Sequence, residues 1–141
     1  MMPLRAGLSA MAMLYGAAVR VRNARYDRGE PTYRPAAPVI SVGNLTVGGT
    51  GKTPMVVALV ERLMGSGMKP AVLMRGYRAD ASGMNDEHRM LQRRCPEIVC
   101  LCDPDRCRAA RAAVEQHGAD ALVLDDGFQH RRLARDLDLV L

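Results

Sequence analysis

The chain has 141 residues, of which 48% are hydrophobic and 25% are charged. This is the composition of one soluble globular domain and excludes a disordered or fibrous protein. Aromatic residues make up only 4%, with no Trp and one Phe, so stacking surfaces for single-stranded nucleic acid are hard to build. The net charge of +5 is concentrated in residues 1–38, where six Arg stand against Asp27 and Glu30. This imbalance favours an anionic surface as partner, and the shortage of aromatic residues favours a membrane over nucleic acid.

The first predicted element is an amphipathic helix over residues 1–26. Residues 6–19 are uncharged, and this stretch is shorter than the ~20 residues that a membrane-spanning helix needs. Arginines flank it where lipid phosphates would lie, and apolar residues recur at helical spacing: Leu8, Met11, Leu14 and Tyr15. This pattern favours a helix in the membrane interface. A helix of the protein core and a secretory signal cleaved near residues 10–12 stay open as alternatives. Residues 27–38, rich in Pro and charge, are predicted to be a linker.

The most informative stretch is residues 39–54. An apolar β-branched run leads into a glycine-rich turn that ends in Gly-Lys-Thr, and helix-forming residues follow. This order is that of a phosphate-binding loop, in which backbone N–H groups at a helix N-terminus surround an anion. Lys52, one of two lysines beside 18 arginines, would reach the β- and γ-phosphates, and the Thr53 hydroxyl would bind Mg²⁺. A glycine-rich surface turn is the alternative, because Thr46 stands where the usual pattern has its first Gly. The predicted phosphate-binding residues are Thr46, Val47, Gly48, Gly49, Thr50, Gly51, Lys52 and Thr53.

Beyond this loop, apolar strands alternate with helical patterns at regular intervals. The predicted helices are residues 53–66, with Met55, Leu59 and Leu63 facing inward, a short segment around Leu91, and a segment capped by Asp103 that ends near His117. The further predicted strands are residues 71–74, 98–102, 121–124 and 137–141. This alternation predicts an α/β fold, a doubly wound parallel sheet of the phosphate-loop NTPase type formed by residues 39–141. Because the chain ends within a strand that no helix covers, the core is predicted to be truncated at its carboxyl end.

A second group of polar residues follows the strand predicted at residues 121–124. Asp125 and Asp126 come directly after this strand, and Gly127 follows them. In phosphate-loop enzymes, carboxylates at the end of a buried parallel strand lie beside the loop and bind Mg²⁺ or its waters. The alternative is a polar turn built on the Asp126-Gly127 dipeptide.

The four cysteines do not have the spacing of a zinc site. Cys95, Cys100, Cys102 and Cys107 contain no Cys-x₂-Cys pair, which is the usual spacing of zinc ligands. Cys100 and Cys102 would share one face of a strand. We therefore expect reduced structural thiols.

With both motifs established, the chain resembles the tetraacyldisaccharide 4'-kinase family, the lipid A kinases of Gram-negative bacteria. The Gly-Gly-Thr-Gly-Lys-Thr-Pro and Asp-Asp-Gly-Phe-Gln-His runs together are highly specific, and Thr46 in place of the first loop Gly is itself a family feature. The segments that carry the resemblance are residues 14–16, 41–54, 74–77, 85–87 and 125–134. The similarity covers nearly all of this chain but only about the first half of a family member.

The resemblance implies transfer of the γ-phosphate of Mg-ATP to the 4'-hydroxyl of a tetraacylated glucosamine disaccharide 1-phosphate. It implies Asp86 as the catalytic base and Lys52 at the phosphates, with Asp125, Asp126 and Gln129 joining Thr53 around the metal. The family usually has Gly before and Pro after its Asp-Glu pair, where this sequence has Asn85 and His88. The implied partners are the lipid disaccharide and the cytoplasmic side of the inner membrane, where the protein would be peripheral; no nucleic acid is expected.

Two other classes of function stay open from the sequence alone. One is a soluble phosphate-loop NTPase or metabolite kinase, although an Asn-Lys-x-Asp guanine motif is absent. The other is a non-catalytic fragment that binds nucleotide or membrane, since the family's active site also draws groups from its second half.

Overall fold

The computed structural model describes residues 24, 28, 32–44, 51–75 and 86–141. The chain divides into two compact units, Met1–Thr32 and Tyr33–Leu141. In the first unit, the Arg28 N–H donates to the Ala24 carbonyl at 3.2 Å. The interface helix predicted at residues 1–26 and the start of the predicted linker otherwise lie outside the described residues and stay predictions. Within the described part of the chain, no helix combines the length and the apolar character needed to cross a membrane.

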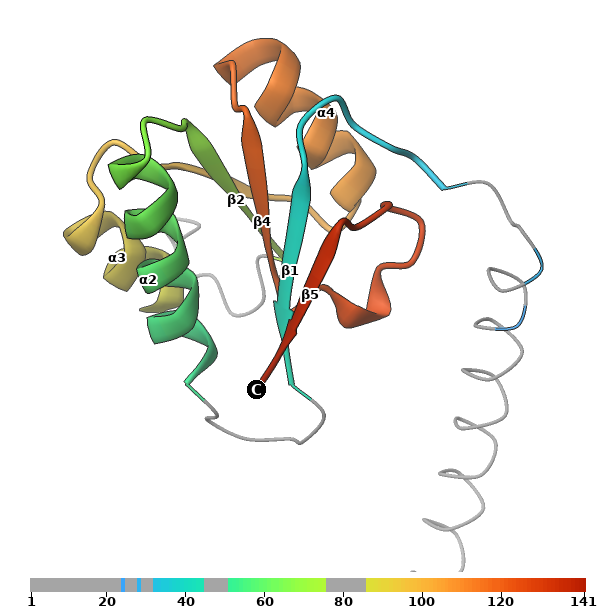
Figure 1. Ribbon diagram of the computed structural model, residues 1–141, viewed down its shortest axis with the longest axis horizontal. Helices are drawn as coiled ribbons and strands as arrows, with labels where there is room; N and C mark the ends of the chain where they lie inside the picture. Colours follow the sequence, from blue (N-terminus) through green and yellow to red (C-terminus); the bar gives the residue numbers. More distant parts are fainter. Residues whose placement is uncertain (1–23, 25–27, 29–31, 45–50, 76–85) are drawn as a thin grey trace, which may run out of the picture. The chain divides into compact units, whose positions relative to one another are not determined.

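The second unit is built on a parallel sheet with the spatial order β3-β2-β4-β1-β5 (Figure 1). Every strand pair in the sheet is parallel, and the predicted doubly wound parallel sheet is thereby confirmed. The strands are β1 (Val39–Gly43), β2 (Pro70–Met74), β3 (Val99–Cys102), β4 (Ala121–Asp125) and β5 (Leu137–Val140). The central strands β2 and β4 are buried at every residue, as expected of strands covered on both faces.

Helices cover both faces of the sheet (Figure 1). The helices are α2 (Lys52–Gly65), α3 (Asp86–Arg94) and α4 (Arg106–His117), and a short 3₁₀ turn, η1 (Gly127–Gln129), follows β4. One core cluster joins α2 and α3 to Val42, Val72 and Val123 of the sheet. The other joins α4 to Leu73 and Leu122 on the opposite face. Two apolar layers therefore enclose the central strands.

The buried face of α2 differs from the predicted one. Val56, Val57 and Val60 are buried, whereas Met55 is 37% exposed. Leu59 and Leu63 pack only partly against the same cluster. The prediction for Met55 was wrong because one helical position turns a side chain by about 100°. The β-branched residues, and not the longer ones, therefore face the sheet.

The start of α4 also differs from the prediction. Asp105, and not Asp103, is the N-cap, and its side chain accepts hydrogen bonds from the Cys107 and Arg108 backbone N–H groups. The Asp103 carboxylate is bound to the Arg108 guanidinium at 2.6 Å instead. Gly118 ends the helix with φ 65°, a conformation that favours glycine.

Residues 33–37, which the sequence assigns to the linker, belong to the second compact unit. Tyr33 forms an isolated parallel bridge with Leu133, and Ala37 and Leu133 lie in the α4-side core. Asp136 accepts the Val39 backbone N–H at 2.8 Å. These contacts hold the entrance to β1 beside the segment that leads into β5.

Candidate nucleotide site

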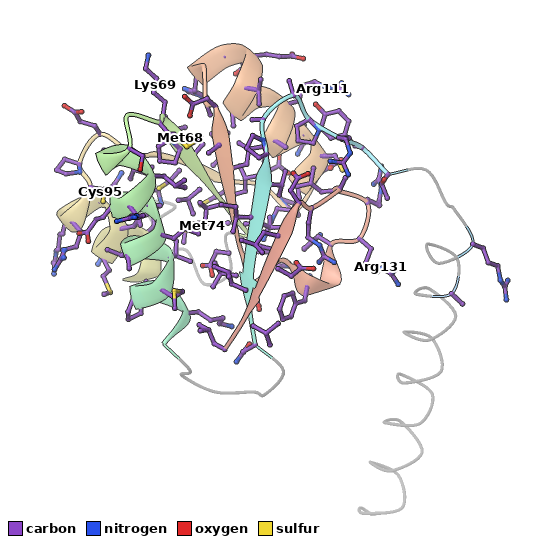
Figure 2. The ribbon with its side chains drawn as sticks, viewed as in Figure 1. Met68, Lys69, Met74, Cys95, Arg111 and Arg131 are labelled. Carbon is purple, nitrogen blue, oxygen red and sulfur yellow. The ribbon has the colours of Figure 1, made fainter. Side chains whose placement is uncertain are left out.

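Parallel topology places the polar residues of the two motifs at one edge of the sheet. All strands of a parallel sheet end at the same edge, and each following helix begins there. β1 and β4 are neighbours, with Val42 opposite Asp125. Asn44, directly after β1, and Asp126, directly after β4, therefore lie near the first residue of α2. In Figure 2, Met68 and Lys69, which precede β2, lie at the opposite edge of the sheet.

Lys52 is the point where these three elements meet. Its Nζ lies 3.2 Å from Asn44 Oδ1 and 3.2 Å from Asp126 Oδ1. The Lys52 side chain is 21% exposed and that of Asp126 is 65% exposed, so solvent screens the ion pair and its own contribution to stability is small. The pairing holds the ammonium group between the residues that directly follow β1 and β4.

Asp126 has a backbone conformation that is uncommon outside glycine. Its φ is 56° and its ψ is 46°, in the left-handed region that Asp tolerates better than most residues. Its backbone N–H donates to the Val42 carbonyl at 2.9 Å. This turn redirects the chain as β4 ends, and it brings the Asp126 carboxylate toward Lys52.

The N-terminus of α2 has no side-chain cap. Gly51 is the N-cap residue, with φ 79°, and the first turn contains no acidic residue. Glycine is suited to this conformation, and it cannot satisfy the first backbone N–H groups of the helix with a side chain. Those groups and the helix dipole are together a ready anion site.

Close packing fixes the ends of β1 and β4 against each other. A Cβ added to Gly43 would lie 2.9 Å from the Phe128 ring, and one added to Gly127 would lie 2.5 Å from Ser41 Oγ. Larger residues at either position would therefore push η1 away from β1. The two glycines keep Asn44 and Asp126 within reach of Lys52.

Of the remaining predicted site residues, some lie at this edge and others fall outside the described residues. Asp125 is 7% exposed at the end of β4, and Thr53 follows Lys52 in the first turn of α2. Thr46 to Thr50 lie outside the described residues. Only the backbone is described at Asp86, which opens α3, and at Gln129, which ends η1. No group of three His, Cys, Asp or Glu side chains in the described ranges has the arrangement of a metal site.

Two residues at this edge were missed by sequence reasoning. Asn44 was available as the polar residue between β1 and the loop, but nothing in the sequence pairs it with Lys52. Arg106, at the start of α4, is 2% exposed, although an arginine in a first helical turn is expected at the surface. Burial, and the nearby Arg75, lower the pKa of Arg106, whereas Asp125 acts in the opposite direction.

The cysteines are free thiols. Cys95 is buried in the α2-side core, and Cys100 packs against that core; Figure 2 labels Cys95 at the end of α3. Burial raises the pKa of the Cys100 thiol to about 12, so it stays protonated at neutral pH. Cys102 Sγ lies 4.0 Å from His88 Nδ1.

The comparisons with known proteins assign the chain to a family. A family model described as tetraacyldisaccharide-1-P 4'-kinase matches residues 4–141. The chain belongs to this family. A tetraacyldisaccharide 4'-kinase of Anaeromyxobacter sp. (strain K) is 51% identical over 144 residues, which cover 90% of this chain and 38% of the relative. The Bdellovibrio bacteriovorus tetraacyldisaccharide 4'-kinase is 43% identical, covering 98% of this chain and 45% of its own length.

A solved member of the tetraacyldisaccharide 4'-kinase family has the same fold. The chain resembles the crystal structure of LpxK from Aquifex aeolicus in complex with ATP, with a TM-score of 0.82 and 32% identity. The match covers 97% of this chain and 48% of that one. This chain therefore spans less than half the length of the relatives named here, and its described fold is that of their matching part.

Proposed function

We propose that this chain forms the nucleotide-binding part of an ATP-dependent kinase that phosphorylates the 4'-hydroxyl of tetraacyldisaccharide 1-phosphate in lipid A biosynthesis. The observation that carries the proposal is Lys52, held between Asn44 and Asp126 at the uncapped N-terminus of α2. Family membership and the ATP complex of the similar structure support the choice of substrate and nucleotide.

The roles of the phosphate loop follow from its chemistry. Lys52 would exchange its contacts with Asn44 and Asp126 for the β- and γ-phosphates of ATP. Backbone N–H groups of residues 46–51 and of the first turn of α2 would surround the same phosphates. Since phosphoryl transfer depends mainly on position and charge neutralisation, this cradle would supply a large part of the catalysis.

The residues around Lys52 also fit a magnesium ion. Mg²⁺ prefers oxygen ligands and usually takes one or two carboxylates together with phosphate oxygens and water. Asp125 ends β4 and Asp126 follows it, next to the start of α2, where Thr53 lies. We propose that Thr53, Asp125, Asp126 and Gln129 hold this ion directly or through water. When bound, the ion neutralises charge on the β- and γ-phosphates.

Asp86 is the proposed catalytic base. It is the first residue of α3, and a helix that follows a parallel strand begins at the carboxyl edge of the sheet. Asp86 therefore belongs to the same edge as Lys52. Its proposed task is to take the proton of the sugar 4'-hydroxyl as that oxygen attacks the γ-phosphate.

The proposed location is the cytoplasmic side of the inner membrane, with the protein peripheral. The acceptor is a lipid, so the enzyme has to reach a bilayer surface. Residues 1–38 carry a net charge of +4, from six Arg against Asp27 and Glu30, which suits anionic headgroups. We propose that residues 1–26 supply this contact.

The test uses a completed kinase in which the carboxyl-terminal part of the Anaeromyxobacter relative follows Leu141. Labelled γ-phosphate should pass from Mg-ATP to tetraacyldisaccharide 1-phosphate in detergent micelles. Asp86→Ala should lower kcat by about 10²–10⁴ with little change in KM for ATP, because a base acts in the transition state. Glu97→Ala, an exposed carboxylate near the opposite edge, is the matched control. Transfer to a soluble acceptor instead would assign the site to a metabolite kinase.

A further inference from the structure

Cys102 and His88 bring a thiol and an imidazole together at the carboxyl edge of the sheet. Cys102 is the last residue of β3, and His88 lies in the first turn of α3. Cys102 Sγ and His88 Nδ1 are 4.0 Å apart, although the two residues are 14 positions apart in the chain. Spacing along the chain does not reveal such a pair. Thiolate sulfur and imidazole nitrogen are the side-chain ligands that zinc prefers.

The strand pattern directs the Cys102 side chain toward α3. Side chains two positions apart share one face of a strand, and Cys100 packs against the core cluster that contains Leu91 of α3. Cys102 therefore lies on the face that α3 covers, as its contact with His88 requires. β3 is an edge strand of the sheet, and Cys102 at its end is exposed. Water therefore reaches the sulfur atom.

The separation of the two atoms suits one bridging cation. Zinc binds a thiolate at about 2.3 Å and an imidazole at about 2.0 Å, and in a tetrahedral arrangement these bonds place sulfur and nitrogen about 3.5 Å apart. The observed distance of 4.0 Å is wider by about half an ångström, which small rotations of the two side chains can supply. Two protein ligands leave two tetrahedral positions for water, and the exposure of Cys102 permits this.

Among its described neighbours, Cys102 is the group best placed to become an anionic ligand. The Asp103 carboxylate is bound to the Arg108 guanidinium at 2.6 Å. Burial first, and then Cys102, raise the pKa of the Cys100 thiol to about 12, so that thiol keeps its proton. Burial also raises the pKa of Cys102, but the Arg106 guanidinium lowers it. Of the two thiols of β3, the one of Cys102 therefore loses its proton more readily.

We propose that Cys102 and His88 together bind one divalent cation of the zinc class, with water completing a tetrahedral shell. Binding releases the thiol proton to solvent, because the thiolate is the ligand. The site is distinct from the proposed magnesium site, since Mg²⁺ prefers oxygen ligands and zinc accepts sulfur and nitrogen. The bound cation would fix the first turn of α3, where Asp86 lies. It would thereby slow phosphoryl transfer, an effect that rests on the proposed kinase function.

The test titrates the reduced 141-residue chain with Co²⁺, which takes the place of zinc and gives a near-ultraviolet absorption band when a thiolate binds it. One equivalent of Co²⁺ should produce this band. Zn²⁺ should abolish the band by displacing Co²⁺, and a large excess of Mg²⁺ should leave it unchanged. Absence of the band, or displacement by Mg²⁺ as readily as by Zn²⁺, would overturn the proposal.

Three variants assign the ligands. Cys102→Ser should abolish the Co²⁺ band. His88→Gln should weaken Zn²⁺ binding at least roughly tenfold, since loss of a group that merely supports a metal ligand already costs roughly 10- to 100-fold. Cys107→Ser is the matched control, because Cys107 packs against the core on the α4 side of the sheet, and it should keep the band and the affinity of the parent. A band that persists in Cys102→Ser, parental affinity in His88→Gln, or a band lost in Cys107→Ser contradicts the assignment.

The completed kinase separates failure of this inference from failure of the proposed function. In excess Mg-ATP, added Zn²⁺ should lower the rate of transfer by the parent more than that by Cys102→Ser. If Zn²⁺ lowers both rates equally, the proposed inhibition is overturned and the kinase function stands. If the chain binds Zn²⁺ through Cys102 but no lipid is phosphorylated, the proposed function fails and the metal site remains.

Discussion

The N-termini of α2 and α4 lie at the same edge of one parallel sheet, yet they are built differently. α4 begins at Asp105, whose carboxylate accepts two backbone N–H groups of its own first turn. α2 begins at Gly51, which has no side chain, and its first turn contains no acidic residue. The N-cap side chain of α4 therefore satisfies N–H groups at the N-terminus of that helix, whereas the N-terminus of α2 has no such cap. From this difference we expect α2, and not α4, to bind an anion through backbone groups.

The same contrast holds for the neighbouring side chains. Lys52 reaches out from α2 toward Asn44 and Asp126, and those contacts can be exchanged for phosphate oxygens. At α4, the Cys107 and Arg108 backbone N–H groups already donate to the Asp105 carboxylate. Of these two helix ends, we therefore expect the one of α2 to bind the phosphates of a nucleotide.

The largest expected effect is on nucleotide affinity. Lys52→Ala removes the positive charge at the uncapped end of α2 and should weaken Mg-ATP binding by about 1.5–3 kcal/mol, roughly 10- to 150-fold. Calorimetric titration of the 141-residue chain measures it. Lys69→Ala is the matched control, because Lys69 lies at the opposite edge of the sheet (Figure 2). Equal Mg-ATP affinities of the Lys52 variant and the parent chain would contradict the phosphate-loop assignment.

Removing the N-cap of α4 should lower the stability of the domain and leave nucleotide affinity unchanged. Asp105→Ala leaves two N–H groups of α4 without their side-chain acceptor, and loss of an N-cap costs about 0.5–2 kcal/mol. For a domain of about 110–140 residues, 1 kcal/mol corresponds to about 3–4 °C in Tm. Thermal unfolding measures the loss, and Mg-ATP affinity should stay the same. A fall in affinity as large as that of Lys52→Ala would mean that the two helix ends are not distinct.

The smallest effect concerns the Cys107 thiol in the first turn of α4. A helix N-terminus usually lowers a cysteine pKa. Burial first, and then the Asp105 carboxylate, raise the pKa of Cys107, so the thiol should react slowly with iodoacetamide at pH 8. Asp105→Asn removes the negative charge, lowers the pKa and should speed alkylation, measured by mass spectrometry of the Cys107 peptide. An unchanged alkylation rate would show that the Asp105 carboxylate does not control the electrostatic potential at this helix end.

Much of the fold was predictable because its signals are local. Apolar β-branched runs and glycines mark β1, α2 and their junction, and the pattern is read without knowing the neighbours. The same is true of Lys52, and of Asp126 after β4. The strand order that brings Asn44 and Asp126 together is not local, so neither contact with Lys52 could be derived from the sequence.

The errors have the same cause. Pro104 favours the first position of a helix, which makes Asp103 the expected N-cap, but Asp103 is bound to Arg108 and the helix begins two residues later. The burial of Arg106 likewise depends on how the segment after η1 packs beside α4. Sequence spacing carries no information about that packing.

The most direct test of the account follows the backbone amides of both helix ends while Mg-ATP is added to the ¹⁵N-labelled chain. Anion binding by backbone groups should shift the amides of Gly51, Lys52 and Thr53 saturably, with one affinity. The amides of Cys107 and Arg108, which already donate to Asp105, should move far less. Saturable shifts at Cys107 and Arg108 with none at the start of α2 would contradict the central claim that the uncapped helix is the nucleotide site.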